Sequence, residues 1–141
     1  MSNLKSLKTL TQIVFASGMF DLIGGVYFIL LVGVDKSISN PPTHPFYAIL
    51  IGIFLLCLGY LQIMSSFNIR RYLFNIGTAL LSRIFYVILF TYYFLSVKDF
   101  PTTFLPTCIA DLIWTVLIIF LIGVSNEFRI KDLFLPVSER V

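Results

Sequence analysis

The chain has 141 residues, of which 58% are hydrophobic and only 12% carry a charge. A soluble domain of this length needs more polar sequence to cover its exterior, so the composition excludes one. The net charge of +3 comes from scattered terminal and loop residues, without the basic stripe that nucleic-acid binding requires. The lipid bilayer is the expected partner, and we expect no nucleic-acid partner.

Four apolar stretches, each close to the roughly 20 residues of a membrane-spanning helix, occupy most of the chain. They predict an all-α fold, an integral membrane four-helix bundle with short loops and a single transmembrane domain over residues 1–141. The expected helices cover about 10–34, 46–67, 72–96 and 104–124. The first stretch is longer than a signal-peptide core, so we expect a permanent helix there. Residues 125–141 form an amphipathic tail, which we expect to lie along the membrane surface before it frays.

Small and polar residues share one face of each of the first two expected helices. They are Ser17, Asp21, Gly24 and Gly25 in the first helix, where Phe28 lies on the same face, and Gly52, Gly59, Gln62 and Ser66 in the second. Small residues let helices approach closely and screen a charge from lipid. We therefore expect these two helices to pack on each other with Asp21 pointing inward. Contact with a ligand is the alternative use of the second face.

The third expected helix carries Arg83 near its middle, where an unpartnered arginine costs from about 3 to more than 10 kcal/mol. Counting about 1.5 Å per residue, Asp21 and Arg83 lie about 15 and 16 Å from one membrane edge, and Asp111 about 10 Å from the other. In a core about 30 Å thick, these depths predict that the three charges can meet. Their formal charge of −1 leaves one aspartate able to take a proton, a water chain or a ligand.

The charge cluster Asp21–Arg83–Asp111 has two interpretations. In the first it is structural and fixes which helix packs on which. In the second it lines a pocket, where Arg83 holds an anionic or carbonyl group and an aspartate exchanges protons. Candidate lining residues of such a pocket are Gln62, Asn75, Ser82, Tyr86 and Trp114. The residues alone assign no catalytic group.

Several kinds of site and activity are not expected. The only histidine, His44, falls in an expected loop, which leaves no in-membrane haem or metal site. No Gly-rich phosphate loop or nucleophile elbow is present, and we expect no cofactor. The sequence shows no inverted repeat and no broken helix, the features that would indicate a stand-alone transporter. A pore would require several copies of the chain.

The orientation follows from the distribution of Lys and Arg between the two sides of the membrane. The side that holds both termini carries Lys5, Lys8, Arg70, Arg71, Arg129, Lys131 and Arg140. The other side carries Lys36 and Lys98. This asymmetry predicts that both termini are cytoplasmic.

Four motifs carry a resemblance to a known group of proteins. They are Asp21-Leu22-Ile23-Gly24-Gly25, Leu58-Gly59-Tyr60, the central Arg83, and Asp111-Leu112-Ile113-Trp114. Over its whole length the chain resembles the small four-helix bacterial membrane proteins called DoxX-like. That resemblance implies an inner (plasma) membrane location and an accessory subunit of a membrane oxidoreductase or quinone-related complex. The chain is more faintly similar to EXPERA-type bundles, which hold a lipid-like amine against carboxylates and lack a central arginine.

These observations give three functional hypotheses. The first is an accessory subunit or a protein that binds a small apolar or quinone-like ligand at the buried cluster. The second is a membrane enzyme, of the isomerase or oxidoreductase type, that acts on a lipid- or quinone-like substrate by proton transfer at an aspartate. The third is a homo-oligomer that serves as a channel or transporter component. A larger membrane complex fits the first and third.

Overall fold

A computed structural model describes residues 2–34, 45–98, 104–125 and 128–134. It contains α1 (Ser2–Tyr27), continued by the π-helical segment η1 (Phe28–Val34), then α2 (Pro45–Phe67), α3 (Ile69–Ser96), α4 (Leu105–Ser125) and a 3-10 helix, η3 (Ile130–Leu133). Four of these helical stretches are long and apolar enough to cross a membrane. The predicted all-α four-helix membrane bundle is confirmed. The expected loops at 35–45 and 97–103 lie largely outside the described residues.

Two helices begin earlier in the chain than the apolar stretches indicate. α1 begins at Ser2 rather than near Leu10, because no proline or glycine interrupts the polar residues that precede the apolar run. α3 begins at Ile69 rather than at Tyr72, because the Asn68 side chain accepts a hydrogen bond from the Arg71 backbone N–H at 3.2 Å and caps the helix there. Tyr72 marks a kink, with φ −109° and ψ 23°.

The bundle carries apolar side chains on its outside and polar ones inside. Large apolar residues are widely exposed on all four helices, among them Ile23, Phe67, Leu95 and Phe120. The buried polar and charged residues are Ser17, Asp21, Gln62, Ser65, Ser66, Arg83, Thr115 and Ser125. Lipid tails accept the first set and exclude the second, so this distribution is that of a protein surrounded by a bilayer.

α1 and α2 pack closely through two pairs of glycines. A Cβ added to Gly18 would lie 2.8 Å from the Gly59 carbonyl oxygen, and one added to Gly25 would lie 2.8 Å from that of Gly52. The two pairs are about two helical turns apart, which is the register of an antiparallel helix pair. The expected packing of these two faces on each other is confirmed.

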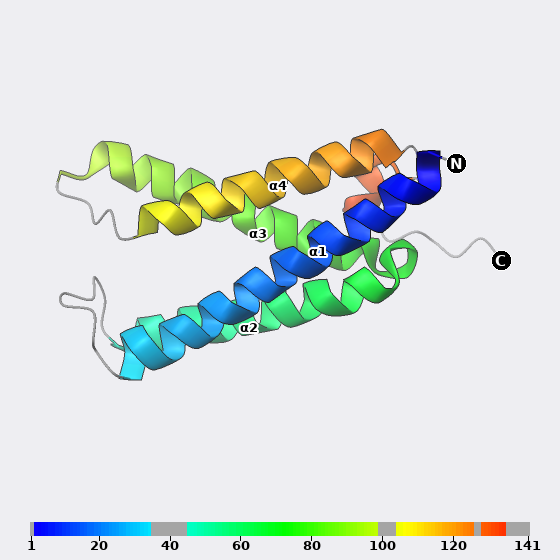
Figure 1. Ribbon diagram of the computed structural model, residues 1–141. Coiled ribbons are helices and arrows are strands. Elements are labelled where there is room, and N and C mark those ends of the chain that lie inside the picture. The colour runs from blue at the N-terminus through cyan, green and yellow to red at the C-terminus, as the bar shows by residue number, and fades with distance from the viewer. Residues whose placement is uncertain (1, 35–44, 99–103, 126–127, 135–141) are drawn as a thin grey trace.

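The four helices form two antiparallel pairs, α1 with α2 and α3 with α4, which diverge toward one end (Figure 1). We call the end where α1 begins and α2 passes into α3 the closed end, and the opposite one the open end. An apolar core fills the closed end and joins α1, α3, α4 and η3. It consists of Leu10, Val14, Ile69, Leu73, Ile76, Leu80, Ile118, Ile122 and Leu133.

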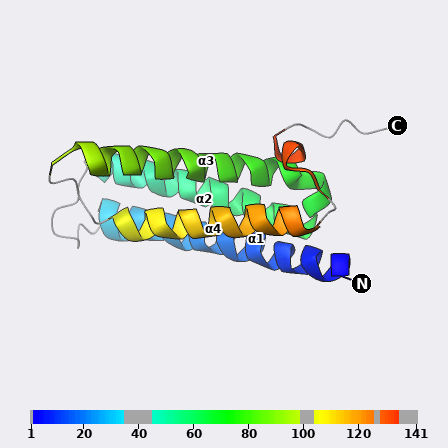
Figure 2. The same cartoon turned by 90° about the horizontal axis from the view of Figure 1, so that it is seen from above.

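The described part of the C-terminal tail packs on the bundle. η3 lies against the first part of α3 (Figure 2), and Leu133 is buried in the closed-end core. Gly77 makes this approach possible, since any Cβ there would overlap the Leu133 backbone carbonyl. At Leu133 the tail thus packs into the core, where burial of the apolar side chain is favourable. The expected position of the tail along the membrane surface stays a prediction. Residues 126–127 and 135–141 lie outside the described residues.

Alanine at Gly59 and at Gly123 is expected to have opposite effects on stability. At Gly59 the new Cβ meets the Gly18 carbonyl oxygen at 2.7 Å and the Leu22 backbone nitrogen at 2.9 Å. These are backbone atoms, so the helices must separate, at a cost of about 1–3 kcal/mol. At Gly123 the Cβ meets nothing within 4 Å, and the gain in helix propensity stabilises by about 0.5–1 kcal/mol. Unfolding by SDS in mixed micelles measures both; equal effects would contradict close α1–α2 packing.

Candidate functional site

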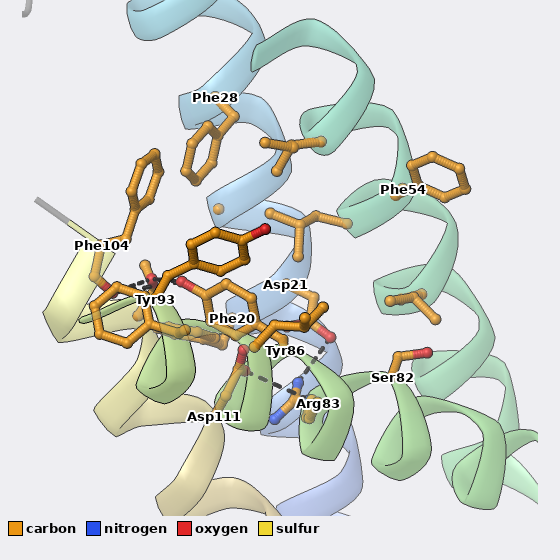
Figure 3. Close-up of a pocket in the computed structure, with 17 residues that line it drawn as sticks. Phe20, Asp21, Phe28, Phe54, Ser82, Arg83, Tyr86, Tyr93, Phe104 and Asp111 are labelled. Atoms are coloured by element: carbon orange, nitrogen blue, oxygen red, sulfur yellow. Dashed lines mark hydrogen bonds and ion pairs between the residues drawn. The ribbon is translucent and has the colours of Figure 1, made fainter. Parts of the chain in front are cut away.

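A cavity of about 440 Å³ lies between the two helix pairs, in the part of the bundle that opens. All four helices contribute to its wall, which is almost entirely apolar. Seven aromatic side chains line it: Phe20, Phe28, Phe54, Tyr86, Phe90, Tyr93 and Phe104. The three charges Asp21, Arg83 and Asp111 lie together at one end of it, and Phe28 and Phe104 lie at the other (Figure 3).

Arg83 pairs most closely with Asp21. Its Nη2 atom lies 2.7 Å from Asp21 Oδ2, and the same nitrogen is 3.5 Å from the backbone oxygen of Ser17. The Arg83 and Asp21 side chains are only 4% and 3% exposed. Such a pair has excellent geometry and almost no water around it, so breaking it leaves an uncompensated charge in an apolar interior. The pair joins α3 to α1.

Gln62 extends this network to α2. Its Nε2 group donates to Asp21 Oδ2, and its Oε1 accepts from the Ser17 hydroxyl at 2.7 Å. The Asp21 carboxylate therefore accepts from both a guanidinium and an amide, and one buried carboxylate connects three helices. The negative charge of Asp21 is therefore neutralised and hydrogen-bonded within the protein.

Asp111 occupies a different environment. Its Oδ1 lies 3.7 Å from Arg83 Nε, an ion-pair distance that is too long for a hydrogen bond. Among the described residues nothing donates a hydrogen bond to it. The side chain is 15% exposed and lines the cavity. The cluster thus contains one paired carboxylate and one that is open to the cavity.

A second polar group stands on the wall between α3 and α4. The Tyr86 hydroxyl lies 2.8 Å from Thr107 Oγ1, and the Thr107 hydroxyl donates to the Phe104 carbonyl at 2.7 Å. The Phe104 ring in turn stacks on Phe28, with centroids 5.8 Å apart and planes 5° from parallel. This stack connects η1 to the start of α4 at the end of the cavity away from the charges.

The side of the cavity between α2 and α3 is open. The lining residues there are exposed: Phe54 by 61%, Leu89 by 55%, and Tyr93 by 48%. All three positions fall within membrane-spanning stretches. The cavity therefore opens sideways, toward lipid tails.

Two of the five candidate lining residues line the cavity, namely Ser82 and Tyr86. Gln62 is buried behind Asp21 in the hydrogen-bond network described above. Asn75 lies about two turns nearer the closed end than Arg83, and Trp114 packs beside the Phe20 ring, with centroids 6.2 Å apart. These three residues are not part of the lining, because helical spacing fixes a face but not how deep a cavity extends.

The aromatic lining residues beyond Tyr86 were not predicted from the sequence. Phe90 and Tyr93 follow Arg83 and Tyr86 on one face of α3 at spacings of three and four. From that periodicity, Phe90 and Tyr93 could have been predicted to continue the polar stripe of α3 and to line the same cavity. No local signal marks the stack of Phe28 on Phe104, which joins residues far apart in the chain.

No family model, curated protein or solved structure matches this chain. The function therefore rests on the geometry of the site. In the described part of the chain, no group of three or more His, Cys, Asp or Glu could hold a metal ion. The cavity offers an apolar volume, an open carboxylate and a buried ion pair, which suit the binding and orientation of an apolar molecule.

Replacing Arg83 with leucine is expected to cost about 3–5 kcal/mol of stability, because it leaves Asp21 and Asp111 buried without a cation. Adding Asp21→Asn and Asp111→Asn to Arg83→Leu should recover much of that loss, since the triple variant holds no unpaired charge. SDS unfolding of the wild type, the single and the triple variant compares them. A triple variant no more stable than Arg83→Leu would show that packing, not charge, is lost.

Proposed function

We propose that this small multi-pass membrane protein binds a small apolar ligand that is dissolved in the bilayer. The observation that supports this best is the cavity of about 440 Å³ with an aromatic wall and charges at one end. Ligand sites are typically about 300–1,000 Å³, mainly apolar, with a few polar groups that orient the ligand. This cavity has each of these properties.

The position of the opening favours a ligand that arrives through the membrane. The gap between α2 and α3 is bordered by Ile51, Phe54 and Leu89, all apolar and exposed. An apolar molecule can pass from lipid tails to this wall without meeting water. A water-soluble molecule would have to cross lipid first. A lipid- or quinone-like molecule therefore suits the cavity better than a polar metabolite.

A membrane enzyme is the second candidate. The observation that favours it is the Asp111 carboxylate, which faces the cavity and accepts no hydrogen bond from the described residues. A carboxylate so placed can take a proton from a bound substrate, as isomerase- and oxidoreductase-type reactions require. Comparing both the mass and the chromatographic retention of the bound molecule before and after incubation separates an enzyme from a binding protein, because an isomerase changes the retention without changing the mass.

The resemblance to DoxX-like proteins supports a related proposal, that the chain is an accessory subunit of a larger inner-membrane complex. The binding site and this role are compatible, because an accessory subunit can hold a ligand for its partner. We further propose that both termini are cytoplasmic, on the distribution of Lys and Arg.

The binding proposal predicts that filling the cavity abolishes ligand retention. A Cβ on Gly24, which lines the cavity, meets only Leu55 Cδ1 at 3.6 Å, so Gly24→Phe places its ring in the cavity without a backbone clash. Gly123→Phe makes the same change where a Cβ meets nothing. In native mass spectrometry after mild extraction, the wild type and Gly123→Phe should carry a small apolar molecule and Gly24→Phe should not. An adduct kept by Gly24→Phe, or missing from the wild type, would refute the proposal.

The orientation predicts which single cysteines an impermeant maleimide reaches. In a chain with Cys57→Ala and Cys108→Ala, a cysteine at Lys98 should be labelled in intact cells. One at Arg71, in the opposite end of the bundle, should react only after permeabilisation. Both positions are exposed, so accessibility of the side chain does not distinguish them. The reverse labelling pattern would place the termini outside.

A further inference from the structure

At the charged end of the cavity, the Asp111 carboxylate is an accessible acceptor that receives no hydrogen bond from the described residues. The Arg83 cation is less available to a ligand. Its Nη2 is used by Asp21 and the Ser17 carbonyl, its Nε faces Asp111, and its Nη1, which has no partner among the described residues, is fully buried. An incoming anion or carbonyl therefore meets a guanidinium whose charge is already shared by two carboxylates.

Three of the four hydroxyl groups that line the cavity are also occupied. The fourth, on Tyr93, lies about three helical turns along α3 from Arg83, away from the charged end. Ser82 donates to the Thr78 carbonyl at 3.0 Å, and Thr107 donates to the Phe104 carbonyl. The Tyr86 hydroxyl lies within reach of both Thr107 and the Phe104 carbonyl. These groups make the wall less polar than its composition indicates, and the Asp111 carboxylate remains as the open acceptor.

The charge of the cluster points the same way. Two carboxylates and one guanidinium carry a formal charge of −1 in surroundings that are otherwise apolar. A negative charge with little water around it is stabilised by a hydrogen-bond donor or a cation and destabilised by another anion. The aromatic faces beside it also attract cations.

From these observations we infer the class of ligand: an amphiphile with an apolar body and a head that donates a hydrogen bond to Asp111. This inference rests on the proposed binding function and adds the polarity of the head. The head lies at the charged end of the cavity, and the body extends past Tyr86 toward Phe28 and Phe104, which lie at the other end in Figure 3. A hydroxyl and an ammonium share this chemistry, whereas an anionic or acceptor-only head does not.

The test uses four probes with matched chains, each at the same mole fraction in phosphatidylcholine nanodiscs that contain the full chain. They are dodecylamine, 1-dodecanol, dodecanoic acid and 2-dodecanone. The melting temperature is measured for the wild type, for Asp111→Asn and for Gly24→Phe, whose filled cavity reports the effect of each probe on the bilayer alone. Asp132→Asn makes the same chemical change in η3, outside the spanning helices, and serves as the matched control.

We expect the amine, the alcohol or both to raise the melting temperature of the wild type and of Asp132→Asn relative to Gly24→Phe. The acid and the ketone should not. Asp111→Asn should bind the stabilising probes about tenfold more weakly or worse, because it removes the charged acceptor. Stabilisation by the amine alone identifies a cationic head, and stabilisation by the alcohol alone a neutral one.

Two results would overturn the inference while leaving the binding function intact. One is stabilisation by the acid or the ketone equal to that by the amine and the alcohol. The other is unchanged binding of those donors to Asp111→Asn, or to Asp111→Thr should the asparagine variant not fold. If no probe separates the wild type from Gly24→Phe, the cavity takes none of these amphiphiles, and the proposed binding function fails with the inference.

Discussion

The pairing of Arg83 with Asp21 is the constraint on which the rest of the bundle depends. An arginine in the middle of a membrane-spanning helix costs several kcal/mol unless it meets a partner, and here the partner lies on α1 at 2.7 Å. α3 can therefore pack in one register only. Gln62 brings α2 to the same carboxylate. Apolar side chains cannot set this register, because lipid tails solvate them as well as the protein does.

The cavity follows from how differently the two helix pairs pack. Glycines let α1 and α2 approach until their backbones touch. On the other pair, Gly77 is covered by Leu133 and Gly123 faces open space, so neither brings α3 and α4 together. Aromatic rings separate the pairs instead, and the stack of Phe28 on Phe104 spans the gap on one side. The closed-end core holds the helices together while the other end stays apart.

Much of this arrangement is predictable from the sequence, and the reasons are specific. Counting residues along straight helices gives the depth of Asp21 and Arg83, because the bilayer fixes where each helix crosses. Glycine spacing predicts which faces of α1 and α2 meet. The cavity is not predictable in this way, because it arises where helices diverge, and divergence depends on contacts between distant residues. The inward turn of Leu133 onto Gly77 has the same origin.

Asp21 and Asp111 have different roles in the charge cluster. Neutralising Arg83 requires one carboxylate, and Asp21 supplies it with good geometry. A second buried carboxylate adds a desolvation cost that the 3.7 Å approach to Arg83 Nε offsets only in part. A bundle that needed the cluster only to fix its packing would be more stable with an apolar residue on α4. A ligand that enters between α2 and α3 and donates a hydrogen bond to Asp111 would offset this desolvation cost. The presence of a second buried carboxylate is therefore explained by ligand binding and not by packing.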